Sequence, residues 1–328
     1  MSHGGPSNQL PIAIAHRGGN EIYPENTIEA FKDAVAMGYQ RLETDVHFTQ
    51  SGELLAIHGQ TYEGGDEGPD NNNYVHIANK PVLISTIKPE DRPAMAEDGF
   101  YIPTLDEVLD INNEVHWNID AKKQEAVEPL LTVLRKQSAF PRVTLASFNE
   151  ESIGRLRAGS PDGTSTALVQ DELMQIYFAS LDPETKVDLP SNTRAQVPTH
   201  FGDIEIITPE IMATAKRLNI PVDVWTINDM NEMLRLMDAG VDGIFTDKLR
   251  TLQKAQQIDE MRKFHRNMTA EIDEMAQDAS WAVGSDGKII QDVRENTELY
   301  VNTAHHSGGI KGARYILDSL RQQFKQNR

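Results

Sequence analysis

The chain contains no cysteine among its 328 residues, so disulfide bonds cannot stabilise it. It also has no apolar run of about twenty residues, the length that a membrane-spanning helix needs. Its first residues show no basic segment followed by an apolar one, so a secretory signal is not indicated. These absences predict a cytoplasmic protein without stable insertion into a membrane.

Positive charge is scarce as well, since 31 Lys and Arg stand against 50 Asp and Glu and give a formal net charge of −19. Residues 1–250 carry the whole imbalance, with 20 basic and 39 acidic residues, whereas residues 251–328 carry 11 of each. Affinity for DNA and RNA comes mainly from basic contacts to phosphates, so this composition argues against nucleic acid as a partner. An anionic small molecule would need a local positive field, for which Arg17 and Lys122 are candidates.

Short apolar runs alternate with amphipathic segments, and 39% hydrophobic content suffices for a full core. We expect strands at residues 12–15, 41–46, 115–120, 143–147, 165–169, 194–197, 222–226 and 243–246. We expect helices near residues 27–38, 104–112, 123–138, 149–158, 171–180, 209–218, 229–238 and from 248 onward. Eight such pairs predict an α/β protein with a (β/α)₈ TIM barrel. Residues 204–207 are an alternative sixth strand, and Asn26 with Glu29 is expected to cap the first helix.

The barrel pattern ends near residue 250, which predicts three parts: an N-terminal segment 1–10, the barrel 11–250 and a largely helical extension 251–328. Apolar residues recur at spacings of mostly three and four from residue 248 to 279, as in a long amphipathic helix. They are Leu249, Leu252, Ile258, Met261, Phe264, Met268, Ile272 and Met275. Two uses of this face stay open: packing on the barrel exterior and a homo-oligomer contact. His305 and His306 lie further on, in a Gly/Ser-rich segment typical of a solvated loop.

Chemically versatile residues follow the predicted strands closely. His16 comes directly after the first strand, and Glu43 and Asp45 leave the same face of the second, because side chains alternate along a strand. Asp120 and Lys122 share a face at the end of the third predicted strand. The carboxyl ends of barrel strands form one catalytic face, so these side chains should converge. Three carboxylates suit a hard divalent cation, Mg²⁺ or Ca²⁺.

Each of these residues also has a structural interpretation. A Glu-x-Asp pair commonly lies on a solvated strand edge, Asp120 and Lys122 could form a surface ion pair, and Trp225 at a strand end could simply cap the barrel. Taken together, the order and spacing favour a functional site.

The segments His16-Arg17-Gly18-Gly19 and Pro24-Glu25-Asn26-Thr27 resemble the signature of the glycerophosphodiester phosphodiesterase family. Later segments, at residues 99–109, 117–122, 224–228 and 240–247, are similar to other parts of the same family. The resemblance covers residues 11–250.

This resemblance implies a metal-dependent hydrolase of lipid and glycerol metabolism that converts glycerophosphodiesters to glycerol 3-phosphate and an alcohol. It implies that Glu43, Asp45 and Asp120 hold the metal. Arg17 and Lys122 would neutralise the phosphate, Trp225 would contact the glycerol or the head group, and His16 and His58 would exchange protons.

Two positions depart from the family pattern: Gly59 follows His58 where the family commonly has Asp, and Asp120 stands where it more often has Glu. The first departure leaves open a phospholipase D-like enzyme acting on lysophospholipids, which would need an exposed apolar patch near the barrel mouth. A catalytically silent barrel that binds phosphorylated ligands is a further alternative.

Overall fold

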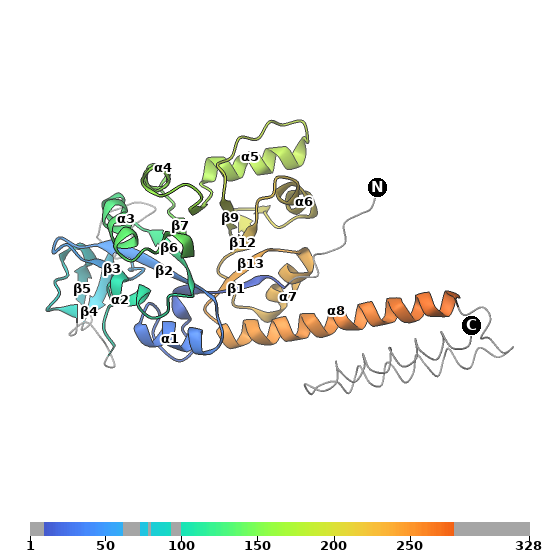
Figure 1. The fold of residues 1–328 in the computed structure, drawn as a ribbon, viewed down its shortest axis with the longest axis horizontal. Helices are drawn as coiled ribbons and strands as arrows, with labels where there is room; N and C mark the ends of the chain where they lie inside the picture. Colours follow the sequence, from blue (N-terminus) through green and yellow to red (C-terminus); the bar gives the residue numbers. More distant parts are fainter. Residues whose placement is uncertain (1–9, 62–72, 78–79, 93–99, 279–328) are drawn as a thin grey trace. The chain divides into compact units, whose positions relative to one another are not determined.

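Eight parallel strands form a closed barrel in the computed structural model, which describes residues 10–61, 73–77, 80–92 and 100–278 (Figure 1). The strands are β1 (Ile12–Ala15), β2 (Arg41–Phe48), β6 (His116–Ala121), β7 (Val143–Ala146), β8 (Ser165–Ala167), β9 (Thr193–Val197), β12 (Val222–Val224) and β13 (Gly243–Thr246). Pairing of β1 with both β2 and β13 closes the ring. The predicted (β/α)₈ barrel and its eight strands are confirmed.

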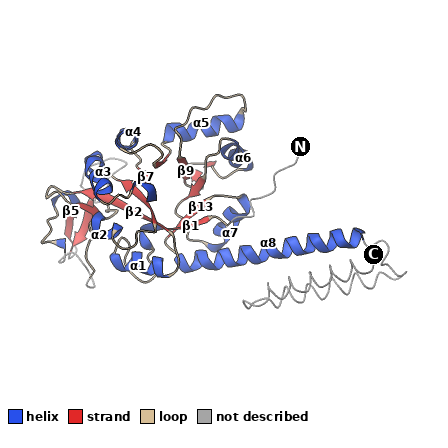
Figure 2. Ribbon diagram, in the orientation of Figure 1, coloured by secondary structure: helices blue, strands red, loops and turns tan. Residues whose placement is uncertain are grey.

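The helices flank the strands, as Figure 2 shows. They are α1 (Ile28–Ala36), α2 (Leu105–Leu109), α3 (Val127–Lys136), α4 (Glu150–Gly159), α5 (Gln170–Leu181), α6 (Pro209–Arg217), α7 (Met230–Ala239) and α8 (Leu249–Asp278). All eight lie where the sequence predicts them. The alternative sixth strand was wrong: residues 204–205 form β11 (Ile204–Glu205), which pairs with β10 (His200–Phe201) in a small hairpin after β9.

Additional strands follow β2. The strand β3 (Leu54–Ala56) runs antiparallel to β2, and β4 (Tyr74–Ile77) pairs with β5 (Lys80–Leu83). Leu55, Ile84 and Ile87 form a small buried core beneath them. Most of the Gly/Asp/Asn-rich segment 66–73, expected to be a flexible loop, lies outside the described residues.

The N-cap of α1 lies one residue later than predicted. The predicted capping pair, Asn26 with Glu29, was wrong, because Asn26 has a left-handed backbone (φ 56°) and an N-cap residue is extended. Thr27 is extended, and its hydroxyl accepts the Ala30 amide at 3.2 Å. The side chain of Asn26 instead accepts a 2.8 Å hydrogen bond from the Thr44 hydroxyl, which ties the loop to β2.

The hydrophobic core lies between the barrel wall and the helices. Leu42 and Val46 on the outer face of β2 are fully buried, and Phe31 of α1 packs edge-on against Trp117 of β6 with 5.1 Å between ring centroids. The barrel interior combines apolar side chains, Ile14 and Phe245, with polar ones: the Gln196 amide donates to Asn118 Oδ1 at 2.7 Å, from β9 across to β6.

The described part of the C-terminal extension continues α8, which begins in the barrel unit, Met1–Ala255, and extends into a second unit, Gln256–Arg328. Leu249 and Leu252 at its start are buried. The long predicted helix is confirmed, while the oligomeric contact stays a prediction. His305 and His306 lie outside the described residues. No described helix combines the length and apolarity needed to cross a membrane.

Candidate active site

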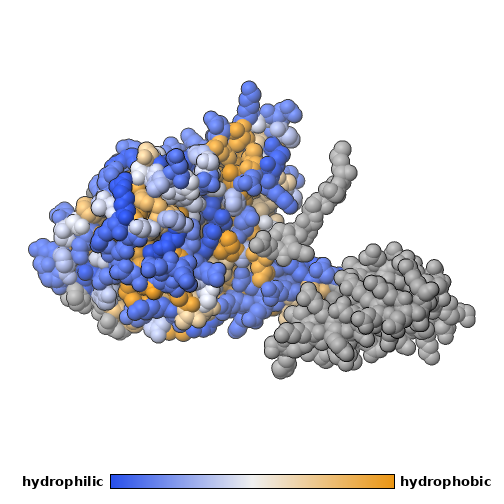
Figure 3. Space-filling model, viewed as in Figure 1, coloured by the Kyte–Doolittle hydropathy of each residue, from blue (hydrophilic) through white to orange (hydrophobic). Residues whose placement is uncertain are grey.

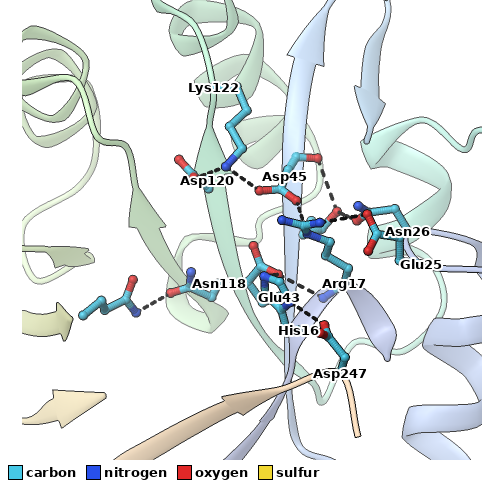
Figure 4. A network of polar contacts seen from close by, with 12 residues as sticks. His16, Arg17, Glu25, Asn26, Glu43, Asp45, Asn118, Asp120, Lys122 and Asp247 are labelled. Carbon is cyan, nitrogen blue, oxygen red and sulfur yellow. Dashed lines mark hydrogen bonds and ion pairs between the residues drawn. The ribbon is translucent and has the colours of Figure 1, made fainter. Parts of the chain in front are cut away.

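His16 lies where the barrel closes, at the carboxyl end of β1. The pairing of Ala15 with Thr246 brings the residues that follow these strands together, and His16 Nδ1 lies 2.6 Å from Asp247 Oδ1. A carboxylate only accepts, so Nδ1 carries the proton and Nε2 faces the site, 3.8 Å from Glu43 Oε2. Asp247 therefore fixes the ring orientation (Figure 4).

Arg17 joins the loop after β1 to both carboxylates of β2. Its amide donates to Glu43 Oε2 at 2.9 Å, its Nε lies 2.9 Å from Asp45 Oδ2, and its Nη1 donates to Glu25 Oε1 at 2.8 Å. The backbone there is left-handed, and Gly18 follows with φ 78°, where a Cβ would come within 2.8 Å of the Phe31 ring. Gly18 is thus needed for the close approach of this loop to α1.

Lys122 connects the carboxylates of two neighbouring strands. Asp45 and Asp120 are register partners on β2 and β6, and Lys122 Nζ lies 2.7 Å from Asp45 Oδ1 and 2.6 Å from Asp120 Oδ2. Glu43, Asp45 and Asp120 are all buried. The solvated strand edge and the surface ion pair are therefore excluded as interpretations.

Burial and neighbouring charges shift the pKa values of the site residues. Burial and the charge of Asp45 raise the pKa of Glu43. Burial would also raise the pKa of Asp45, but Lys122 and Arg17 outweigh it and lower that pKa. For His16, burial lowers the pKa, while Glu43 and Asp247 raise it by more. Cationic neighbours thus outweigh burial at Asp45 but not at Glu43.

His58 reaches the site because β3 turns back along β2. The Ile57 amide donates to the Asp45 carbonyl at 2.9 Å, which brings the next residue beside Asp45. His58 Nδ1 lies 2.9 Å from the carbonyl oxygen of Gly59, so Nδ1 is the donor, and His47 Nε2 holds the His58 carbonyl at 3.1 Å. Burial lowers the pKa of His58 to about 4.

Trp225 lies at the rim of the mouth, after β12. Its ring packs edge-on against Phe148, which follows β7, with 5.9 Å between centroids. Phe148 is 69% exposed, and its centroid lies 5.7 Å from Lys122 Nζ. The indole therefore belongs to an aromatic pair beside the charged groups and does not simply cap the barrel.

Carboxylate oxygens are suitable ligands for a hard divalent cation. In this structure Asp45 and Asp120 form ion pairs with Arg17 and Lys122. Glu43 is buried and has a raised pKa, so a further cation beside it would stabilise its ionised form. Asp45 and Asp120 share Lys122, and within the described ranges no three acidic, histidine or cysteine side chains already form a metal-binding group. The predicted ligands are thus brought together, and their role stays a prediction.

Sequence reasoning missed Asp247, Asn228, His47 and Phe148. Asn228 Nδ2 donates to Asp247 Oδ2 at 2.8 Å and so orients the partner of His16. Asp247 follows the last predicted strand directly, so closing the predicted barrel would have placed it beside His16. Phe148 follows a predicted strand in the same way, whereas nothing in the sequence marks His47.

Residues 16–251 match the Glycerophosphoryl diester phosphodiesterase family. A glycerophosphodiester phosphodiesterase of Caldanaerobacter subterraneus is 30% identical over 251 residues, which cover 74% of this chain and 96% of that relative. A lysophospholipase D of Mus musculus is 25% identical and covers 71% of this chain and 82% of its own length.

Among solved structures, a phosphodiesterase of Oleispira antarctica in complex with the product sn-glycerol-3-phosphate shares the fold, with a TM-score of 0.55 and 20% identity over 75% of this chain and 96% of that one. The family match spans most of the chain and includes every predicted site residue. This chain therefore belongs to the Glycerophosphoryl diester phosphodiesterase family and is a phosphoric diester hydrolase.

Proposed function

We propose that this hydrolase converts glycerophosphodiesters to glycerol 3-phosphate and an alcohol, with two histidines as proton carriers and Mg²⁺ or Ca²⁺ as cofactor. The observation that carries the proposal is the matched state of His16 and His58. Each has Nδ1 bound to an acceptor, Asp247 or the Gly59 carbonyl, which holds the ring in one tautomer with its proton on Nδ1. Nε2 would then be the nitrogen that exchanges protons.

This arrangement suits a reaction in two steps. The glycerol hydroxyl next to the ester attacks phosphorus while one histidine takes its proton, and the other histidine protonates the departing alcohol. Water then opens the cyclic phosphate with the roles of His16 and His58 reversed. Each proton transfer contributes about 10²–10⁴-fold to the rate.

The charged groups around the histidines would bind the phosphate. Arg17 and Lys122 are the nearby cations, and each lies partly buried against Asp45, so substrate oxygens compete with that carboxylate for them. When bound at Glu43, Asp45 and Asp120, a divalent cation would supply Lewis acidity to the phosphoryl group. The Phe148–Trp225 pair would line the path of the glycerol or the head group.

The test is release of glycerol 3-phosphate from glycerophosphocholine and glycerophosphoethanolamine, first with chelator and then with Mg²⁺ or Ca²⁺ restored. We expect turnover to disappear with chelator and to return with metal. Full turnover in chelator would contradict the proposed metal dependence. Inactivity on both diesters with either metal would contradict the proposed diesterase activity. His58→Ala should lower kcat by about 10²–10⁴-fold. His200→Ala, on the exposed hairpin, is the matched control.

An apolar groove favours a second substrate class, lysophospholipids, which carry an acyl chain on the same glycerol phosphodiester. The groove, with a volume of about 120 Å³, lies between α5, α6 and the β10–β11 hairpin. Phe201 and Ile204 on its rim are exposed, and the hairpin follows β9 at the catalytic end of the barrel. Figure 3 shows apolar surface in the region of α5.

The two substrate classes can be separated by one pair of variants. If the groove binds an acyl chain, Phe201→Ser with Ile204→Ser should raise KM for lysophosphatidylcholine and leave KM for glycerophosphocholine unchanged. Phe178→Ser is the control, because Phe178 on α5 is similarly exposed but does not line the groove. Equal effects on both substrates would exclude this role of the groove.

A further inference from the structure

The amino-terminal end of the barrel interior holds a second group of charged side chains, at the opposite end of the strands from the proposed chemistry. Arg41 and His116 are the first residues of β2 and β6, and Arg194 and Asp223 are the second residues of β9 and β12. All four face the barrel axis, because each has the same parity on its strand as residues that point into the interior. We call these four residues the base cluster. The active-site mechanism uses none of them.

One arginine of the base cluster is fully paired. Arg194 donates from Nε and Nη2 to the two oxygens of Asp223, each at 2.5 Å. Asp223 is fully buried, and Gly243 beside it provides its space, since a Cβ there would collide with the carboxylate. The other nearby acid, Asp242, accepts the Val222 amide at 2.8 Å. The pair of Arg194 and Asp223 is therefore complete without a ligand.

The other arginine, Arg41, forms no such pair in the described ranges. It lies on β2, four strands from β9 in either direction around the ring of eight, so the two arginines approach the axis from opposite walls. Arg41 lies close enough to Arg194 and Asp223 for the charges of both to act on its guanidinium. Within the described ranges, no residue accepts a hydrogen bond from its guanidinium or forms an ion pair with it. Within the base cluster, Arg41 is thus the one charged side chain without a hydrogen-bonded or ion-pair partner in the described ranges.

The hydroxyl of Ser165, on β8, ends a chain of hydrogen bonds that starts at His116 of the base cluster. His116 Nε2 lies 2.9 Å from Thr144 Oγ1, and the Thr144 hydroxyl donates to Ser165 Oγ at 3.1 Å. Thr144 has one hydrogen, so it accepts from His116, whose pKa is lowered to about 4 by burial and by the nearby arginines. The chain of hydrogen bonds ends at Ser165, whose own hydrogen has no acceptor within the described ranges.

A large cavity opens at this end of the barrel. Its volume is about 610 Å³, and Ser165, Arg194 and the loops before β8, β9 and β12 line it. Ser165 and Arg194 therefore lie beside space that a solute can enter.

We propose that the base cluster binds a small phosphate-bearing anion, inorganic phosphate or a phosphate monoester, through Arg41, Arg194 and Ser165. A guanidinium presents paired donors that match two phosphate oxygens. The donors come from opposite walls of the barrel, which suits a tetrahedral group better than a planar carboxylate. The bound anion would give the Arg41 guanidinium a hydrogen-bonding partner.

Calorimetric titration of inorganic phosphate into the metal-free full-length protein counts the sites. We expect Arg41→Gln to remove one equivalent and Lys122→Met to remove a different one, at the mouth. Arg155→Gln, which replaces an exposed arginine on α4, should remove none. If Arg41→Gln binds as many equivalents as wild type with the same affinity, the proposal is wrong. Repeating the titration with glycerol 3-phosphate shows whether the base also accepts a monoester.

A diffraction experiment on the wild-type protein tests the same site without relying on the folding of Arg41→Gln. Crystals soaked in selenate, a heavier analogue of phosphate, should give an anomalous peak between Arg41 and Arg194. A peak at the mouth alone would overturn the proposal. Neither measurement depends on turnover, so the outcome is independent of the proposed diesterase function.

Discussion

The two ends of the barrel interior both bury charged side chains, but they balance the charges differently. At the base, Arg194 and Asp223 satisfy each other through two parallel hydrogen bonds. At the mouth, Asp45 and Asp120 share Lys122, and Glu43 is left with a raised pKa. A matched pair holds the fold together, whereas a surplus of buried carboxylate marks a site prepared for a cation or a reacting group. The comparison predicts that mouth substitutions cost activity and that base substitutions cost stability.

The largest effect should come from the mouth. His16→Ala removes a proton carrier, so we expect kcat on glycerophosphocholine to fall by about 10²–10⁴-fold. Unfolding in urea should change by less than about 1 kcal/mol, because Asp247 keeps its hydrogen bond from Asn228. A variant that loses stability and activity in parallel would break the distinction between the two ends.

At the base, Asp223→Ala leaves the mostly buried Arg194 guanidinium without its acceptors. We expect the free energy of unfolding to fall by about 3–5 kcal/mol, as it does when one partner of a buried ion pair is removed. Glu128→Ala, which breaks an exposed pair with Arg155, should change it little. Urea denaturation compares the two variants, and a similar small loss in both would show that the base pair is not structural.

Stability at the base should also depend on pH through His116. Its folded pKa, about 4, lies below the unfolded value of 6.5, so the folded state binds fewer protons between these values. Stability from this residue is therefore fully present above pH 6.5 and decreases as pH falls toward 4, by about 3 kcal/mol at most. His116→Asn should flatten that decrease while matching wild type at pH 7.5. If the free energy of unfolding in urea depends on pH in His116→Asn as it does in wild type, His116 is not the cause of the decrease.

The sequence predicted the barrel because its strands are short apolar runs that start and stop cleanly. The run 12–15 and the segment 243–246 were each found locally, and their pairing is the closure of the barrel. The N-cap at Thr27 could not be predicted in the same way. It depends on the left-handed backbone of Asn26, which the contact with Thr44 on a different element stabilises.

The site was predictable where motif residues follow strands and unpredictable where partners come from distant segments. His16 was found from its position, but its partner Asp247 is 231 residues away and required the closed ring. Lys122 was predicted to reach phosphate, and its position between Asp45 and Asp120 depends on the register of two strands. The base cluster was missed because Arg41 and Asp223 are single polar residues inside runs interpreted as strand core.

The smallest effect should sharpen the account of the mouth. Asp120→Glu adds one methylene, so the carboxylate could leave Lys122 and extend toward Glu43 and Asp45, which suits a cation that accepts several oxygen ligands. We expect affinity for Ca²⁺ or Mg²⁺, measured by calorimetry without substrate, to rise by about threefold to tenfold, up to about 1.4 kcal/mol. Asp120→Asn keeps the length and removes the charge, so it should weaken binding. If both variants bind metal as tightly as wild type, Asp120 is not a metal ligand and only forms the ion pair with Lys122. That pair would then be structural, like the pair of Arg194 and Asp223 at the base.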